Sequence, residues 1–325
     1  MEATSAIEKS KGLTWYGGGN KPLGASYGKM MMWFFILSDA LTFSAFLVAY
    51  GLIRFKYVDS WPIAEEVFTH VPFTHHPYPL LYVAFMTFVL IFSSVTMVLA
   101  VDAGRQMNKA RVTMYMLLTI IGGLIFLGSQ AWEWKTFIQG SHGALELKDG
   151  KIVQFVNAEG HDIALSEFVH GSNQREKLTR SRGLWFMSGS SVAPYTVNEV
   201  VESFNSNPDI NLKTEKINSE TLKKIIVSRE EASKLLANAT AVVEGANLHV
   251  NEYGKSLFAD FFFFITGFHG FHVFSGIMIN IIIFFNVIIG TYQRRGHYEM
   301  VEKVGLYWHF VDLVWVFVFT FFYLV

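Results

Sequence analysis

The chain has 325 residues, of which 51% are hydrophobic and 31 are Phe, and its net charge is -1. A mean hydropathy of +0.31 is too high for an ordinary soluble domain. The near-zero charge gives no electrostatic reason to expect nucleic acid as a partner. The absence of Cys excludes thiolate metal sites, iron–sulfur clusters and disulfides.

Five apolar segments follow a polar start. The first 29 residues contain Gly17-Gly18-Gly19 and lack the apolar core of a signal peptide. A spanning helix needs about 20 mostly apolar residues. Five segments qualify, at about 30–53, 80–100, 112–136, 257–289 and 305–325. We therefore predict an all-α membrane protein with five transmembrane helices in a bundle, divided into a tail (1–29), helices 1–3 (30–138), an insertion (139–256) and helices 4–5 (257–325).

The insertion, residues 139–256, has the composition of a folded soluble module. Asp149-Gly150 lies between two short alternating runs in L-E-L-K-D-G-K-I-V-Q-F-V, which predicts a hairpin. Residues 219–239 indicate one or two helices, and Ser228 with Glu231 fits a capping box. The insertion shows no catalytic triad, phosphate loop or metal-ligand cluster. We expect a small α+β docking module outside the membrane.

Basic residues predict the orientation of the spans. With five spans, the tail and the loops after spans two and four lie on one side, and they carry Lys9, Lys11, Lys21, Lys29, Arg105, Lys109, Arg111, Arg294, Arg295 and Lys303. Short cytoplasmic loops are enriched in Lys and Arg. The N-terminus is therefore predicted to be cytoplasmic, and the insertion and the C-terminus are predicted to lie outside.

Several ionisable residues lie within the apolar segments: Asp39, Glu133, Asp260, His269, His272, His309 and Asp312. A charged group near the bilayer centre costs about 3 kcal/mol on insertion scales, so such residues are normally paired and buried between helices. Asp39 lies near mid-depth of span one, either as a proton-relay residue or as a polar contact that fixes helix packing. Glu133, flanked by Trp132 and Trp134, and Asp260 are interpreted as interfacial carboxylates.

The histidines admit two interpretations. His269 and His272 are three residues apart and share a helix face, so they could ligate heme iron or copper. His309 is the only other His within the predicted spans, and three His on two helices are too few ligands for a redox centre. We interpret them instead as hydrogen-bonding residues, with Asp39 and Asp312 as candidate acceptors. His75-His76 in the outer loop is interpreted as a solvated pair rather than a metal site.

Four motifs resemble the cytochrome c oxidase subunit III family. They are T-G-F-H-G-F-H-V at 266–273, Y-W-H-F-V-D-L-V-W at 307–315, I-L-S-D with Phe43 in span one, and Q-A-W-E-W at 130–134. The family usually has Glu at the position of Asp39, and Q-A-x-E-Y at the fourth motif. Its seven-helix form has two further N-terminal helices that this sequence lacks, and its short outer loop is replaced here by the insertion.

The resemblance implies a non-redox core subunit of a proton-pumping aerobic terminal oxidase. Such a chain would have no catalytic centre and bind no metal, with heme and copper in partner subunits I and II. It would stabilise subunit I, hold structural phospholipid and support proton uptake, while the complex reduces oxygen to water with electrons from cytochrome c. In that setting Asp39, His269, His272, His309 and Asp312 form a buried polar network. The large insertion and the missing helices favour a bacterial inner membrane, with the insertion and C-terminus in the periplasm.

Two other functions remain open. A subunit III of a quinol oxidase would carry the same motifs and differ in the copper site of its subunit II. A proton-coupled transporter would use Asp39 and the histidines as its path, but repeated halves and broken helices are absent from the sequence. For the cytochrome c oxidase prediction, we hypothesise that the insertion, residues 139–256, contacts another respiratory complex or the cytochrome c donor.

Overall fold

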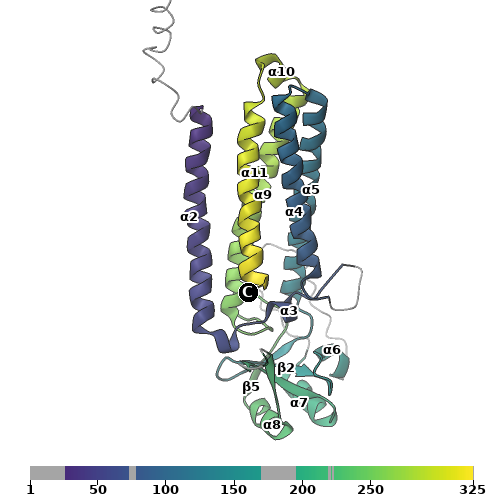
Figure 1. Ribbon diagram of the computed structural model, residues 1–325. Coiled ribbons are helices and arrows are strands. Elements are labelled where there is room, and N and C mark those ends of the chain that lie inside the picture. The colour runs from purple at the N-terminus through teal and green to yellow at the C-terminus, as the bar shows by residue number, and fades with distance from the viewer. Residues whose placement is uncertain (1–25, 73–77, 170–194, 219–220, 222, 325) are drawn as a thin grey trace, which may run out of the picture. The chain divides into compact units, whose positions relative to one another are not determined.

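The computed structural model describes residues 26–72, 78–169, 195–218, 221 and 223–324. It is mostly helical and contains five helices that are long and apolar enough to cross a membrane. They are α2 (Tyr27–Lys56), α4 (Leu81–Arg105), α5 (Lys109–Gln139), α9 (Ser256–Ile288) and α11 (Glu299–Phe319), the last continued by the π-helical turn η3 (Thr320–Leu324) (Figure 1). The predicted fold class is confirmed: this is a multi-pass membrane protein with a small antiparallel sheet between its third and fourth long helices. The predictions for His75-His76 and for most of the 1–29 tail concern residues outside the described ranges.

The chain divides into two compact units, which we describe separately. The helix unit comprises residues 1–46, 89–124 and 271–316, and the sheet unit comprises 47–88, 125–270 and 317–325. The helix unit also contains the short helix α10 (Thr291–Arg295), which begins and ends at glycines with positive φ, Gly290 and Gly296. Positive φ is easily adopted only by glycine, which explains the sharp turn between α9 and α11.

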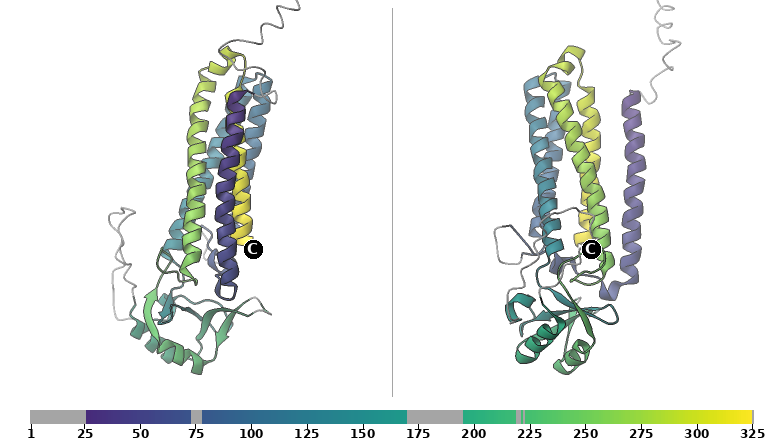
Figure 2. Two further views of the ribbon diagram at one scale, coloured as in Figure 1. Left: turned by 90° about the vertical axis from the view of Figure 1, so that its left-hand side faces the viewer. Right: turned by 180° about the vertical axis from the view of Figure 1, so that it is seen from behind.

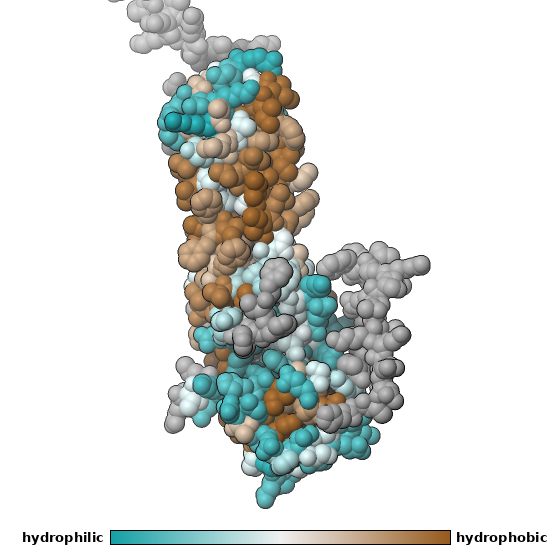
Figure 3. Space-filling view, turned by 90° about the vertical axis from the view of Figure 1, so that its right-hand side faces the viewer, coloured by the Kyte–Doolittle hydropathy of each residue, from teal (hydrophilic) through white to brown (hydrophobic). Residues whose placement is uncertain are grey.

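Helix α2 packs through one face in the helix unit. Phe43 is buried and Asp39 is partly buried, whereas Phe34 and Leu41 are 61% and 66% exposed. Buried positions recur at helical spacing, so only a narrow stripe contacts the other helices of the unit. The exposed side chains are apolar, and Figure 3 shows similar hydrophobic surface over the long helices. Such a surface requires lipid or another chain as its surroundings.

The sheet unit contains a five-stranded antiparallel sheet with the order β4-β3-β2-β1-β5. Its strands are β1 (Ala144–Leu147), β2 (Ile152–Val156), β3 (Asn211–Ile217), β4 (Lys224–Val227) and β5 (Ala239–Val243). The predicted hairpin is confirmed: β1 pairs with β2 in the register Leu145 to Val153, and Gly150 has a φ of 74°. Aspartate followed by glycine suits this turn because glycine accepts positive φ.

Short helices cover one face of this sheet (Figure 2). They are α6 (Leu165–Phe168), α7 (Val197–Ser206) and α8 (Arg229–Leu236). Phe155, Leu212 and Phe204 are buried in the resulting apolar core. Thr196 and Glu199 form a reciprocal capping box at α7, and Ser228 caps α8 by accepting from the Glu231 amide.

The helical interpretation of 219–239 is only half right. The second half is α8, but Lys224–Val227 is strand β4, paired with β3 through Leu212 and Val227. The run K-I-I-V is rich in β-branched residues and favours a strand once a partner strand is present. That partner lies earlier in the chain, so local pattern alone did not identify it.

Charged side chains occupy the opposite face of the sheet. Lys213 Nζ lies 2.5 Å from Asp162 and 3.2 Å from Glu66, and Lys224 Nζ lies 3.3 Å from Glu66. Glu66 belongs to the short helix α3 (Ala64–Val67), which follows the 3₁₀ turn η2 (Val58–Ser60). These ion pairs therefore tie the segment between α2 and α4 to the sheet.

Glu252 joins the entry and exit of the insertion. Its buried carboxylate accepts hydrogen bonds from the backbone amides of Ser141 (2.8 Å), Gly143 (3.2 Å) and Gly245 (2.6 Å). Multiple backbone donors are a favourable environment for a buried carboxylate. A Cβ at Gly245 would lie 2.0 Å from the Ile138 carbonyl oxygen, so this close approach requires glycine.

Candidate functional site

Asp39 and His272 form a carboxylate–imidazole pair in the helix unit. Asp39 Oδ2 on α2 lies 3.0 Å from His272 Nε2 on α9, and both side chains are 11% exposed. The ring of Phe43 meets the imidazole edge-on, with 5.3 Å between centroids. A carboxylate in an apolar span needs such a partner. The structure thus brings together two of the sequence-predicted site residues.

Tyr307 extends this contact to α11. Its hydroxyl lies 2.8 Å from Ser275 Oγ and donates to the His272 carbonyl at 3.1 Å. The first residue of the Y-W-H-F-V-D motif therefore holds α11 against the turn of α9 that carries His272. Hydrogen bonds between helices are a principal means of fixing their register in lipid.

His309 and Asp312 share a hydroxyl group on α4. Ser94 Oγ lies 2.6 Å from His309 Nδ1 and also hydrogen-bonds the Asp312 carboxylate. A hydroxyl has one proton to donate. When Ser94 donates to Asp312, it must accept from His309, which places the His309 proton on Nδ1. The expected pairing of His309 and Asp312 is thus indirect, through Ser94.

Trp308 forms the centre of the helix unit. It is 1% exposed, and its indole Nε1 donates to Ser93 Oγ at 2.8 Å. Gly123 and Gly276 lie against its ring, where an added Cβ would come within 2.6 Å and 3.0 Å of the indole. These glycines allow α5 and α9 to approach the tryptophan closely.

Glu133 lies in the sheet unit and is buried. One carboxylate oxygen accepts from Gln130 Nε2 at 2.9 Å, and Tyr323 of η3 donates to the same carboxylate at 3.1 Å. Asp260, the other carboxylate assigned to an interface, is partly buried in the second turn of α9. Both carboxylates are near helix ends, but Glu133 is enclosed by protein.

The histidine environments do not fit a heme or copper centre. His269 is fully buried with its ring edge-on to Phe126, at 5.7 Å between centroids. His272 faces Asp39, and His309 faces Ser94. In the described part of the chain, no group of three or more His, Cys, Asp or Glu residues is placed to hold a metal ion. We derive no chemical step through a metal here.

Sequence reasoning missed the neutral partners of these ionisable groups. Ser94, Tyr307 and Tyr323 supply hydroxyl groups that contact His309, the His272 carbonyl and Glu133. Trp308 and Ser93, also missed, hydrogen-bond each other. Tyr307 and Trp308 stand in the Y-W-H-F-V-D motif beside His309. Adjacent serines within the apolar run of span two were a further signal, because hydroxyls in lipid-embedded helices seek partners.

Comparisons with known proteins match the C-terminal quarter of the chain. Residues 239–325 match the family model of cytochrome c oxidase subunit III. A subunit 3 from Thermostichus vulcanus is 39% identical over 74 residues, which are 21% of this chain and 34% of the relative. A subunit 3 from Synechocystis sp. is 43% identical over 70 residues, which are 21% of this chain and 30% of the relative. A subunit 3 from Glycine max is 43% identical over 70 residues, which are 20% of this chain and 24% of the relative.

The chain thus spans about a third or less of the length of the curated relatives it matches. The matched part contains α9, α11, both histidine motifs and Asp312. Its partners in the structure, Asp39 on α2 and Ser94 on α4, lie outside it. These matches make residues 239–325 similar to the cytochrome c oxidase subunit III family.

Proposed function

We propose that this chain is a non-redox core subunit of a proton-pumping aerobic terminal oxidase, a complex that reduces oxygen to water. The observation that carries the proposal is the Asp39–His272 contact at 3.0 Å, which joins α2 to the family-matched helix α9. Heme and copper would belong to partner subunits I and II, and cytochrome c would be the electron donor. The apolar surface of α2 supports contact with subunit I and with structural phospholipid.

Asp39 is the residue to which we assign a functional role, support of proton uptake by the complex. It is the acidic side chain nearest mid-depth in α2, and its carboxylate lies 3.0 Å from the His272 imidazole. His269, His309 and Asp312 are assigned to the buried polar network that holds the helices together. Glu133 and Asp260 are assigned to helix ends.

We place the chain in a bacterial inner membrane with the tail in the cytoplasm and the insertion and C-terminus in the periplasm. Arg294 and Arg295 in α10 support this orientation, since short cytoplasmic loops are enriched in such residues. The insertion would then lie on the side from which cytochrome c delivers electrons. We propose that it contacts the donor or another respiratory complex.

Affinity purification in mild detergent through a tag on this chain tests the proposal. Co-purification of heme-bearing subunit I and a copper-bearing subunit II is expected. A subunit II without copper would indicate a quinol oxidase, and a chain that purifies alone and transports a solute in liposomes would overturn the proposal in favour of a transporter. The same purification without residues 140–255 tests the insertion. Unchanged subunit content and donor kinetics would refute its docking role.

Replacing Asp39 tests the assigned role of that residue. Asp39→Ala should leave the heme content of the complex unchanged but make oxygen-consumption activity decay severalfold faster during turnover, because the proton-uptake support is lost. Ser38→Ala is the matched control, since the exposed Ser38 hydroxyl only donates to its own helix at Phe35. Loss of heme on the Asp39 substitution would instead assign this residue to assembly.

A further inference from the structure

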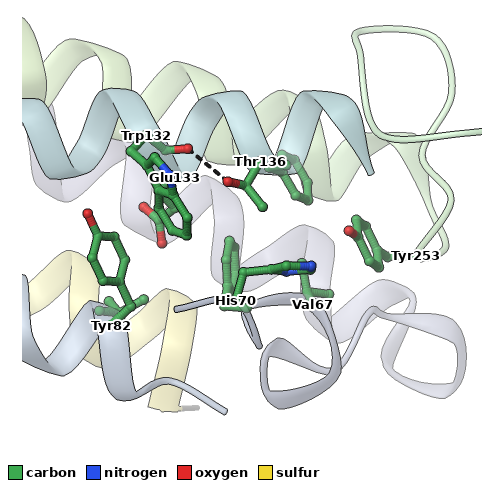
Figure 4. A pocket seen from close by; sticks show the side chains of 10 residues that line it. Val67, His70, Tyr82, Trp132, Glu133, Thr136 and Tyr253 are labelled. Carbon is green, nitrogen blue, oxygen red and sulfur yellow. Dashed lines mark hydrogen bonds between the residues drawn. The ribbon is translucent and has the colours of Figure 1, made fainter. Parts of the chain in front are cut away.

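A small cavity lies beside Glu133 in the sheet unit. Its volume is about 20 Å³, which exceeds the roughly 10–15 Å³ that one water molecule needs on this measure. Figure 4 shows Glu133, Tyr82 and His70 around it, contributed by α5, by α4 and by the segment that follows α3. The cavity thus joins a buried carboxylate of a spanning helix to a histidine outside the spans.

The lining offers hydrogen-bonding groups as well as apolar walls. Val67, Phe68 and Val83 are buried apolar walls. The titratable groups facing Glu133 are Tyr323, which donates to it at 3.1 Å, Tyr82 across the cavity, and His70 and Tyr253 toward the insertion. An ordered buried water typically makes about three hydrogen bonds to such groups. The site is therefore polar enough as well as large enough for water.

His70 lines the cavity and carries a neutral imidazole. Burial lowers its pKa, as does the neighbouring His142, while the Glu252 carboxylate acts in the opposite direction. The imidazole is therefore neutral at neutral pH and has one nitrogen with a free lone pair. Tyr253 also lines the cavity, and its hydroxyl lies 3.0 Å from Ser141 Oγ.

We propose that this cavity binds an ordered water molecule through which Glu133 exchanges its proton with His70 and so with the aqueous phase. The O–H bond of the protonated carboxyl breaks as the water takes that proton. The water gives one of its own protons to the His70 imidazole, leaving a carboxylate, an intact water and an imidazolium. The reverse transfer restores the starting state. This inference concerns Glu133 and His70 and stands independently of the proposed oxidase function.

Infrared spectroscopy of the purified full-length protein with its co-purifying subunits tests the inference. A protonated-carboxyl band that disappears in Glu133→Gln identifies the group, and it should shift rapidly on transfer to D₂O. Val83→Leu adds one methylene to the cavity wall and should slow that shift severalfold. Val83→Ala, at the same position, enlarges the cavity and should leave exchange as fast as in the parent protein. Equal rates in both Val83 variants would overturn the proposal.

A second variant, His70→Gln, tests the proposal even if Val83→Leu fails to fold. His70→Gln leaves the cavity in place but removes the proton acceptor, and it too should slow exchange severalfold. Unchanged exchange in His70→Gln would exclude the proposed route. Infrared spectra of the parent protein and of Glu133→Gln should also be compared across a pH titration. If the variant lacks no protonated-carboxyl band at any pH, Glu133 does not take up a proton, and the proposal is refuted.

Discussion

Three carboxylates, on Asp39, Glu133 and Glu252, each contact a small and well-defined set of partner groups. Asp39 faces one imidazole, Glu133 accepts from one amide and one phenol, and Glu252 accepts from backbone amides on both sides of the insertion. The cost of leaving a buried acceptor unpaired explains why each has partners. The apolar context of Asp39 and Glu133 was evident in the sequence. The identity of their partners depended on which helix turns face one another.

Replacing Glu252 should destabilise the insertion strongly. In Glu252→Gln, an amide NH₂ would face the backbone donors of Gly143 or Gly245, so at least one hydrogen bond becomes a repulsive contact. We expect a loss of about 3 kcal/mol, the scale for breaking a buried charged hydrogen-bond network. Protease resistance of the insertion in detergent measures it. Glu159→Gln, at a side chain 79% exposed, should change nothing, and equal sensitivity of both variants would contradict the prediction.

Among the secondary-structure elements, α5 shows how glycine position controls helix approach. A Cβ on Gly123 would lie 2.6 Å from the Trp308 ring, whereas a Cβ on Gly128 would meet nothing within 4 Å. Both residues occupy the same apolar helix, so their surroundings are the main difference. The apolar run at 112–136 predicted α5, but it gave no indication of which glycine contacts a large side chain.

The matched pair Gly123→Ala and Gly128→Ala tests this difference. Gly123→Ala should lower the thermal stability of the purified protein, because overpacking against a buried indole typically costs about 1–3 kcal/mol. Gly128→Ala should be neutral or slightly stabilising, since alanine favours helix by up to about 1 kcal/mol. A larger loss in Gly128→Ala than in Gly123→Ala would show that the close contact does not limit packing.

The charged face of the sheet should make the insertion sensitive to acid. Burial alone would raise the pKa of Glu66, but the ammonium groups of Lys224 and then Lys213 outweigh it and lower the pKa below 4.5. Burial lowers the pKa of Lys224, with Lys213 adding repulsion, despite the attraction of Glu66. The surroundings therefore favour the charged form of Glu66 and disfavour the charged form of Lys224. The acid side of the stability profile is therefore assigned to Glu66, whose carboxyl pKa is lowered.

The sign of the effect follows from proton binding. Because the carboxyl pKa of Glu66 is lower in the folded state, the unfolded chain binds the proton first as pH falls. The ion pairs therefore stabilise the folded insertion fully above the ordinary pKa of 4.5. That stabilisation is lost as pH falls through the lower pKa of the folded state. Protease resistance of the insertion should therefore fall in that acid window. Glu66→Gln should be less stable at neutral pH, where it leaves Lys213 and Lys224 short of a counter-charge, and should show a smaller acid-dependent loss. An unchanged acid profile would contradict the assignment.

For the molecule as a whole, the sequence predicted those structures whose pattern lies within one helix or one hairpin. Five apolar runs predicted the long helices with ends that differ by up to six residues, as at the start of α11, and Asp149-Gly150 predicted the β1–β2 hairpin. The order β4-β3-β2-β1-β5 could not be predicted, because β1 pairs with β5 nearly a hundred residues later, from Ala144 to Val243. Such pairing depends on long-range packing, which local propensity does not determine.

The proposed topology can be tested on the intact cell membrane. Because the chain has no native Cys, single substitutions Lys148→Cys and Arg295→Cys, both at exposed positions, give a clean background. A membrane-impermeant thiol reagent should label Lys148→Cys in spheroplasts and label Arg295→Cys only after permeabilisation. Labelling of both without permeabilisation would place α10 outside and overturn the predicted orientation.

The adjacent ends of the insertion have a consequence for how such a chain can evolve. Strand β1 starts a few residues after α5 ends, and it pairs with β5 close to the start of α9, while the Ala246 amide donates to the Phe137 carbonyl. A module whose two ends meet can be lengthened, shortened or exchanged without changing the distance that the chain must bridge between α5 and α9. The conformational entropy of closing that connection grows only slowly with its length. Lineages could thus gain or lose a folded module at this junction while the membrane helices keep their places.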